Sequence, residues 1–424
     1  MRPWGRWSPL RAVAAVLGTA FALSSVGSAT AQSAKPIKIG LGMALTGGLS
    51  ANGKPALLAM QIWRDDINKR GGLLDRPVEL IYYDDQTNPA TVPGIYTKLL
   101  DVDQVNFVVS GYGTNLIAPL LPIVMERKLT LMGVLGLANN EKYKYPNYFQ
   151  IQPSGPDPEA NWAMGFFEIA GKLNPRPQTI ALVGADAEYP RHAIDGAREL
   201  VKTFGFKTVY DKSYPPSTVD YTPIARAIKA ANPDIVFVAS YPPDSVGMVR
   251  AAREVGLQPK LFGGGMVGLQ YTSVMTSMGP MLNGIVNYDF WAPERTMMFP
   301  GIEEFFKEYQ ARAEKAGVDP LGYYLPPYAY AAVQILGRAI EATKSLDQQT
   351  VADYIRKTEF RTIVGKVKFG PNGEWAKSRV LMIQYQNIEG RLVEQFKGPG
   401  RKVVLYPEEF KSGNLIYPYS AAQR

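Results

Sequence analysis

Short β-rich runs alternate with longer helical patterns from residue 37 onward, and this alternation restricts the folds that the chain can adopt. In the first half, four runs are typical of strands, at residues 37–43, 78–83, 107–110 and 129–134. Helical patterns lie between them, at residues 56–69, 90–100 and 117–126. Strands that alternate with helices form a parallel sheet with helices on both faces. The sequence therefore predicts an α/β lobe.

The same alternation returns in the second half and predicts a second α/β lobe. Strand-like runs occur at residues 179–183, 207–210, 235–239 and 262–265. Helical patterns separate them, at residues 191–204, 223–231 and 245–255. After Ile363 the pattern changes, and residues 364–386, with a turn at Pro371-Asn372-Gly373, are typical of antiparallel strands and hairpins.

The chain should cross between the lobes more than once. Residues 152–158 are rich in proline and suit a first crossing. A second crossing is expected near residues 284–293, because the helical patterns at 302–316 and 328–343 are needed to cover the first sheet. The fold class predicted is α/β, with two doubly wound parallel-sheet lobes joined by a three-segment hinge. The predicted division is residues 35–155 and 287–360 for lobe 1, and residues 156–286 and 361–424 for lobe 2.

The N-terminus has the features of an export signal. Arg2, Arg6 and Arg11 precede an apolar run at 12–23, and Ala29-Thr30-Ala31 offers a small-residue cleavage site. Residues 1–31 are therefore interpreted as a signal peptide, and no later run approaches the length of a membrane-spanning helix. The chain contains no cysteine, which excludes thiol catalysis and disulfides. Its formal charge of +8 is scattered, so we expect no nucleic-acid partner.

Glycine-rich loops follow several predicted strands, and the carboxyl ends of parallel strands are where ligands bind. The most informative loop is Gly111-Tyr112-Gly113-Thr114-Asn115. Its glycines let backbone amides approach a ligand, while Thr114 and Asn115 add side-chain donors at a helix start. This is typical of an anion site, although a helix cap without a ligand explains the loop equally well. Tyr189 and Tyr241 follow strands of the second lobe, and ordinary packing explains them as well as contact with a ligand does.

Three other patterns favour structural roles. Residues 48–55 nearly match a phosphate-binding loop, but Pro55 stands where a hydroxyl must hold magnesium, so we expect a turn into a helix. Asp84 and Asp85 are strand neighbours that point in opposite directions, so we expect them to cap a turn. His192 is the only histidine, which excludes a two-histidine metal site, and we expect it to face solvent.

Six segments, taken in order, resemble the type I periplasmic solute-binding proteins of the leucine, isoleucine and valine importers. They are residues 37–40 leading to Leu45-Thr46-Gly47, residues 66–72, Tyr83-Asp84-Asp85, and residues 232–238, 250–257 and 328–333. The resemblance covers nearly the whole chain after the signal. It implies the type I periplasmic binding protein fold, in which two lobes close on a ligand.

The resemblance also implies which residues bind the ligand. In this family one lobe holds a carboxylate with hydroxyls and amides from two loops, which fall here on Thr114 and Asn115 and on Gly136, Leu137 and Ala138. The other lobe contributes two tyrosines, which match Tyr189 and Tyr241. The remaining predicted site residues are Tyr112, Gly265 and Met266.

Two departures from the family pattern affect the expected ligand. Gly265 stands where an acidic residue usually meets the ligand's ammonium group, and Ala138 and Asn115 replace a threonine and a serine. A buried ammonium group without a carboxylate is costly. Apolar and aromatic loop residues suit a larger apolar body, and they are Tyr112, Leu135, Leu137, Met266, Phe290 and Trp291. We therefore predict a carboxylate ligand with an aromatic or aliphatic tail.

The resemblance implies a periplasmic solute-binding component of an ABC importer. The expected partners are a small-molecule ligand and a membrane permease, and the protein should be a monomer. We expect no enzymatic activity, cofactor or metal, because no loop offers a nucleophile beside a base. Two alternatives remain on the same scaffold: a binder of branched-chain amino acids, amides or urea, and an extracytoplasmic ligand sensor.

Overall fold

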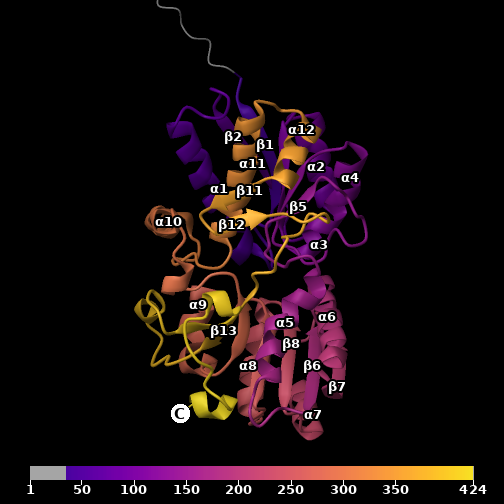
Figure 1. Cartoon of the computed structure of the whole chain (residues 1–424), viewed down its shortest axis with the longest axis vertical. Helices are drawn as coiled ribbons and strands as arrows, with labels where there is room; N and C mark the ends of the chain where they lie inside the picture. The colour runs from indigo at the N-terminus through magenta and orange to yellow at the C-terminus, as the bar shows by residue number, and fades with distance from the viewer. Residues whose placement is uncertain (1–34, 424) are drawn as a thin grey trace, which may run out of the picture. The chain divides into compact units, whose positions relative to one another are not determined.

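The computed structural model describes residues 35–423 (Figure 1). The predicted signal peptide and its cleavage near Ala31 lie outside these residues. Among the described helices, none has the length and apolar character needed to cross a membrane.

The first lobe is built on a five-stranded sheet in which all neighbouring strands are parallel, in the order β2-β1-β3-β4-β5. Its strands are β1 (Ile37–Met43), β2 (Val78–Asp84), β3 (Phe107–Tyr112), β4 (Leu131–Val134) and β5 (Tyr148–Gln150). Strand β3 is buried along its whole length, because helices cover both of its faces. The predicted α/β lobe is confirmed, and β5 is a strand that the sequence pattern did not reveal.

Helices from two distant parts of the chain cover this sheet. They are α1 (Ser50–Lys69), α2 (Val92–Asp101), α3 (Thr114–Ile117), α4 (Leu121–Glu126), α10 (Ile302–Ala316), α11 (Pro326–Thr343) and α12 (Gln348–Lys357). Helices α1 and α11 approach closely at Gly337, where a Cβ atom would lie 2.6 Å from the ring of Trp63. The predicted return of the chain to cover the first sheet is therefore confirmed.

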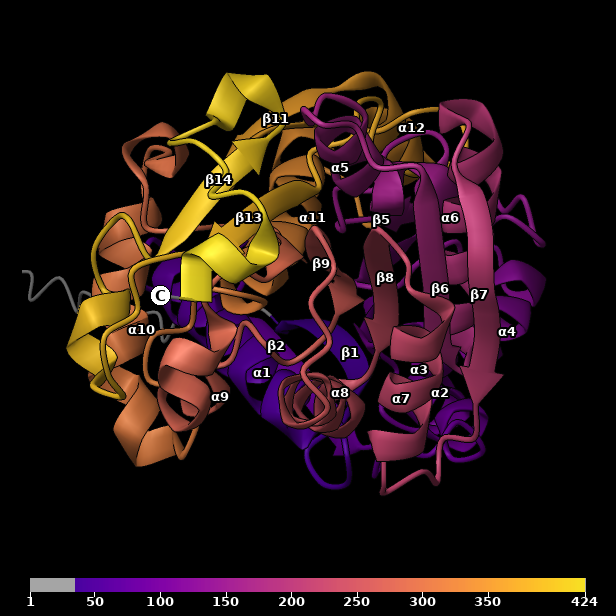
Figure 2. The same ribbon diagram turned by 90° about the horizontal axis from the view of Figure 1, so that it is seen from below.

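The second lobe is built on a seven-stranded sheet in the order β14-β13-β10-β9-β8-β6-β7. Its strands are β6 (Thr179–Ala185), β7 (Lys207–Tyr214), β8 (Ile235–Ser240), β9 (Leu261–Met266), β10 (Val286–Asp289), β13 (Leu381–Tyr385) and β14 (Lys402–Tyr406). Figure 2 shows β9, β8, β6 and β7 side by side. The last two strands in the chain pair antiparallel, as the C-terminal pattern predicts. The helices of this lobe are α5 (Pro158–Gly171), α6 (Glu188–Phe204), α7 (Thr222–Ala231), α8 (Pro242–Glu254) and α9 (Thr272–Met278).

Three segments connect the two sheets. The first runs from β5 to α5, and the second runs from β10 to α10. The third follows the antiparallel hairpin of β11 (Glu359–Thr362) and β12 (Gly365–Lys368) and leads to β13. The hairpin lies beside α11, and Gly373 O still accepts a hydrogen bond from Gln150 N in β5 (2.8 Å).

These contacts bear on the lobe boundaries, which we propose to move by a few residues. Strand β10 pairs with β9 and β13, so residues 287–289 lie with the second sheet rather than with lobe 1. Residues 361–373 contact the first lobe, whereas β13 belongs to the second sheet. The third crossing is then best placed near Ser378 and Arg379, where Arg379 N donates to Pro153 O of the first crossing (2.8 Å).

Candidate functional site

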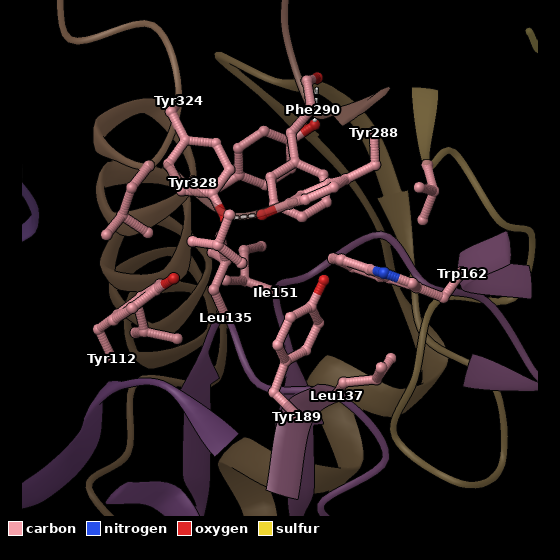
Figure 3. Close-up of a cluster of buried hydrophobic side chains, with 14 of the residues drawn as sticks. Tyr112, Leu135, Leu137, Ile151, Trp162, Tyr189, Tyr288, Phe290, Tyr324 and Tyr328 are labelled. Carbon is pink, nitrogen blue, oxygen red and sulfur yellow. Dashed lines mark hydrogen bonds between the residues drawn. The ribbon is translucent and has the colours of Figure 1, made fainter. Parts of the chain in front are cut away.

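Aromatic and aliphatic side chains from both lobes meet in one buried cluster (Figure 3). We call it the interlobe cluster. The first lobe contributes Tyr112, Leu135, Leu137, Ile151, Tyr324 and Tyr328, and the second contributes Trp162, Tyr189, Tyr288 and Phe290. Tyr112 ends β3, Tyr288 lies at the end of β10, and Trp162 lies in the second turn of α5. The cluster therefore occupies the region where strand ends of the two sheets face each other.

The rings of the cluster are in direct contact across the lobes. Across the lobes, Phe290 stacks on Tyr324 at 5.5 Å, and within the second lobe the ring centroids of Trp162 and Tyr288 are 4.4 Å apart. Tyr288 and Tyr324 also share a hydrogen bond between their hydroxyls at 2.6 Å. Burial raises the pKa of Tyr112 and Tyr189 above the usual tyrosine range, so both hydroxyls are neutral at physiological pH.

Beside the cluster, two buried donors of the second lobe are unsatisfied in the described part of the chain. Trp162 Nε1 has no acceptor in hydrogen-bond geometry, and Tyr241 Oη has no partner among residues 35–423. The Tyr241 ring lies 5.6 Å from that of Tyr189, so both donors adjoin the cluster. An unmade buried hydrogen bond is costly. These two groups are therefore candidates for contact with a bound molecule.

Gly265 lies beside the same groups. Its carbonyl oxygen accepts a hydrogen bond from Tyr189 Oη at 2.7 Å. A Cβ atom at Gly265 would lie 2.9 Å from Tyr189 Oη and 3.1 Å from Trp162 Nε1. The space of an acidic side chain at this position is thus occupied by two hydrogen-bond donors. Met266 is fully buried, and Asn287 bonds both its backbone N (2.9 Å) and its O (2.8 Å).

The two predicted loops of the first lobe are bonded to each other. Thr114 Oγ1 accepts a hydrogen bond from Leu137 N at 3.0 Å, and Asn139 Nδ2 donates to Thr114 O at 2.8 Å. The Thr114 hydroxyl can still donate its own hydrogen. Asn115 Oδ1 is buried and has no partner in the described part of the chain.

The loop after β4 has an unusual backbone. Leu135 and Ala138 have φ values of 43° and 56°, a region that side chains other than glycine rarely adopt. At Gly136 a Cβ atom would meet Asn139 Oδ1 at 2.1 Å, so a side chain at this position would have to displace Asn139, which bonds to Thr114 O. Backbone strain of this kind gathers at ligand-binding sites. The structure thus brings nine predicted site residues to one region, Tyr112, Thr114, Asn115, Gly136, Leu137, Ala138, Tyr189, Tyr241 and Gly265.

The carboxylates closest in sequence to the second-lobe tyrosines have other partners. Asp244 accepts hydrogen bonds from Tyr221 Oη (2.9 Å) and Tyr214 Oη (3.3 Å). The Asp186 side chain is 61% exposed and lies 3.6 Å from Arg191 Nε. Glu188 is half-buried, and burial raises the pKa of its carboxyl. Asp244 and Asp186 therefore do not replace the acid that is missing at Gly265, although Glu188 is near Tyr241.

The remaining sequence interpretations have mixed outcomes. Asp84 caps a turn, since it accepts hydrogen bonds from Leu45 N (3.0 Å) and Gln86 N (2.8 Å), and Asp85 Oδ1 accepts one from Thr87 N (2.9 Å). The prediction that His192 faces solvent is wrong, because the ring is partly buried and its Nδ1 contacts Glu159 across α5 and α6.

Trp291 packs on Phe306 and Tyr323, and its Nε1 donates to Met297 O (2.9 Å), rather than joining the cluster. Five cluster residues were not predicted from the sequence: Ile151, Trp162, Tyr288, Tyr324 and Tyr328. The sequence offered only a weak indication of two of them, which is their position beside a helix start. Tyr324 precedes Pro326-Pro327 at the start of α11, and Trp162 follows the first crossing by one helical turn.

Comparisons with known proteins identify the class. The sequence model of the family described as periplasmic binding protein matches residues 36–388. The Leu/Ile/Val-binding protein homolog 7 of Brucella abortus (strain 2308) is 24% identical over 415 residues, which cover 94% of this chain and 98% of the relative. The chain belongs to the periplasmic binding protein family. The class predicted from the six sequence segments, a periplasmic binding protein of ABC transporters, is confirmed.

Solved structures agree on the fold. A leucine-binding protein from Thermotoga maritima superposes with a TM-score of 0.71 at 21% identity, covering 83% of this chain and 96% of that one. A solute-binding protein of an ABC transporter from R. palustris, solved with benzoate, gives a TM-score of 0.72 at 14% identity, covering 87% and 95%. The two-lobed type I fold is therefore confirmed, and the family consists of binding proteins rather than enzymes.

Proposed function

We propose that this protein binds a small carboxylate with an aromatic or aliphatic tail between its lobes and delivers it to the membrane permease of an ABC importer. The protein acts as a monomer in the periplasm, after cleavage of its signal near Ala31. The solute-binding protein from R. palustris that was solved with benzoate supports this ligand class by analogy.

The observation that carries the proposal is the environment of Gly265. Trp162 Nε1 and Tyr189 Oη lie where the ammonium-binding acid of an amino-acid binder is expected. Trp162 Nε1 and Tyr241 Oη are donors without an acceptor among residues 35–423, whereas the Tyr189 hydroxyl already donates its hydrogen to Gly265 O. A carboxylate ligand satisfies such donors, whereas an ammonium group would be buried against them without an acceptor side chain.

The other predicted residues take complementary roles in this proposal. The first lobe holds the polar end of the ligand with the Thr114 hydroxyl and with the loop at Gly136, Leu137 and Ala138. Asn115 adds an amide group. Tyr112 and Leu137 line the apolar space for the tail, and Met266 supports the strand end that carries Gly265. Closure of the lobes about the three crossings buries the ligand.

Binding of a branched-chain amino acid is the second candidate. It is favoured by the half-buried Glu188, whose carboxylate is near Tyr241 and could accept a bond from an ammonium group. The curated relative from Brucella abortus carries a branched-chain amino acid name, which supports the same candidate.

Calorimetry on purified, ligand-stripped protein separates the two candidates. The probes are benzoate and 4-hydroxybenzoate, together with leucine and its desamino analogue 4-methylpentanoate. We expect the three acids without an amino group to bind more tightly than leucine, and to raise the melting temperature by mass action. Tight binding of leucine with no response to 4-methylpentanoate would establish the amino-acid candidate instead.

A further inference from the structure

A large cavity lies outside the interlobe cluster and shares no residue with it. Its volume is about 1350 Å³. We call it the hinge groove, because its walls come from α1, α10, α11 and the β11–β12 hairpin on one side and from residues 407–410 on the other, with residues 375–379 of the third crossing between them. This volume exceeds the roughly 300–1,000 Å³ of most small-molecule pockets.

Arg379 lines this groove and is buried without an acid. Only 7% of the residue is exposed, and no carboxylate oxygen in the described chain lies within 4.0 Å of its guanidinium. Its Nη2 donates to Val364 O and lies 3.5 Å from Tyr328 Oη, while its Nε has no partner among the described residues. A buried cation needs a compensating group.

Aromatic rings supply part of that compensation. The Arg379 guanidinium carbon lies 4.6 Å from the ring centroid of Trp375, 5.0 Å from that of Phe299 and 5.8 Å from that of Phe410. Cation–π contacts hold the guanidinium in place but leave its net charge unpaired. The same rings offer an apolar surface beside the charge, since all three residues line the groove.

The rest of the groove is also cationic. Eight Lys or Arg residues line it, against five Asp or Glu residues. Most of the acids already have partners: Glu359 pairs with Lys366 (3.2 Å), Glu409 pairs with Lys377 (3.1 Å), and Glu308 pairs with Arg312. Arg338 has no carboxylate within 4.0 Å in the described chain, and burial and the nearby charge of Arg70 lower its pKa. An anion in the groove offsets the repulsion between the positive charges of Arg338 and Arg70.

From this geometry we propose that the hinge groove is a second binding site, for a small organic anion with two or more negative charges carried by carboxylate or phosphate groups. Arg379 anchors one charged group, Arg338 and its neighbours hold the other, and the rings of Trp375 and Phe299 cover the organic body. This site is separate from the interlobe cluster, and its assignment holds whichever ligand the interlobe cluster binds.

The anchor lies in the third crossing, bonds directly to the first and reaches the second through Tyr328, so occupancy of the groove is coupled to the hinge. Arg379 N donates to Pro153 O in the first crossing at 2.8 Å. Tyr328 Oη, which Arg379 Nη2 approaches, donates to Phe290 O in the second crossing at 3.0 Å. A ligand that contacts Arg379 therefore biases the positions of the lobes. An anion in the groove then changes the affinity of the interlobe site for its ligand, and the interlobe ligand changes the affinity of the groove for the anion by the same factor.

Calorimetric titration of purified protein with citrate and, separately, with pyrophosphate tests the proposal. We expect at least one of the two anions to bind, with an affinity that falls as salt is added. Arg338→Gln should weaken binding at least tenfold and Arg379→Gln should abolish it. Lys212→Gln, at an exposed position of β7 away from the groove, is the matched control and should bind as the parent does.

Each outcome decides the proposal. Binding of citrate alone or of pyrophosphate alone supports it and identifies the preferred group. If neither anion binds, or if binding survives both Arg338→Gln and Arg379→Gln, the groove is not an anion site. Circular dichroism checks that Arg379→Gln folds, and if it does not, the pair Arg338→Gln and Arg361→Gln serves in its place.

Discussion

The interlobe cluster and the hinge groove both combine aromatic rings with hydrogen-bond donors, but they differ in charge. The unsatisfied donors of the cluster are neutral, an indole N–H and a tyrosine hydroxyl, whereas the groove presents guanidinium groups. Neutral donors act at short range and depend on geometry, while cations attract any anion within about 8–10 Å at physiological salt. The comparison indicates that the cluster selects a ligand by shape and that the groove selects it by charge.

The largest expected effect comes from placing a charge in the neutral site. Gly265→Glu should reduce benzoate affinity by at least about a hundredfold, because its carboxylate would take the unsatisfied donor Trp162 Nε1, crowd Tyr189 Oη and repel the ligand's own carboxylate. Calorimetry with benzoate measures this loss. Citrate binding in the groove should be retained, which separates the two sites.

Gly265→Ala is the control for that variant. It adds only a Cβ atom, which must displace Tyr189 Oη at 2.9 Å, so its cost measures crowding without charge. If alanine and glutamate reduce benzoate affinity equally, crowding explains the loss and the argument from charge is wrong. A gain in leucine affinity in the glutamate variant alone would strengthen that argument.

Removal of one neutral donor should have the next largest effect. Trp162→Phe keeps an aromatic ring beside Tyr288 but loses Nε1, which has no acceptor within residues 35–423. If that donor binds a carboxylate, benzoate affinity falls by about 1.5–3 kcal/mol, the value of a hydrogen bond to a charged group. Unchanged affinity, measured by calorimetry with melting temperature as a check on packing, would remove Trp162 from the site.

The fold and the site were not equally predictable from the sequence. Strand β1 was predicted at its observed bounds, Ile37–Met43, because buried parallel strands form continuous apolar runs bounded by turn residues. Strand β5 has only three residues, and its pairing with β4 depends on residues distant in sequence. Local pattern cannot encode such a contact.

The site residues show the same limit. Tyr189 and Tyr241 were predicted because they follow strands and match a family pattern, whereas Trp162 lies on a helix whose other faces are also apolar. Only the approach of the second sheet decides which face of that helix meets Tyr288. Arg379 carried no signal, because an isolated arginine in a sequence does not show that it will be buried.

Loss of the Tyr241 hydroxyl should have a smaller effect. Tyr241→Phe removes a buried hydroxyl without a partner in the described chain and leaves the ring contact with Tyr189. We expect benzoate affinity to fall by about 0.5–1.5 kcal/mol, with no loss of stability. Tyr288→Phe is the matched control, because its hydroxyl already bonds to Tyr324. That variant should lower the melting temperature more than it lowers affinity.

The smallest expected effect is that of pH on the interlobe cluster. Burial raises the pKa of Tyr112, Tyr189 and Tyr241 above the usual value of about 10, so these hydroxyls keep their protons as the pH rises. Benzoate, like other carboxylates, is ionised above about pH 6. We therefore expect its affinity to vary by less than about twofold between about pH 6 and 9.

Glu188 introduces one exception on acidification. Burial raises the pKa of this carboxyl, so it takes up a proton at a higher pH than an exposed glutamate and removes a negative charge near Tyr241. Benzoate should consequently bind slightly more tightly as Glu188 takes up its proton. Glu188→Gln should remove this pH dependence and bind benzoate with the tighter affinity at every pH. A decline in benzoate affinity on acidification, or an unchanged slope in Glu188→Gln, would contradict this reasoning. For leucine the affinity should change with pH in the opposite direction. If Glu188 accepts a hydrogen bond from the ammonium group of leucine, leucine binds more weakly as the pH falls. The pH dependence of the two affinities therefore distinguishes a site for acids from a site for amino acids.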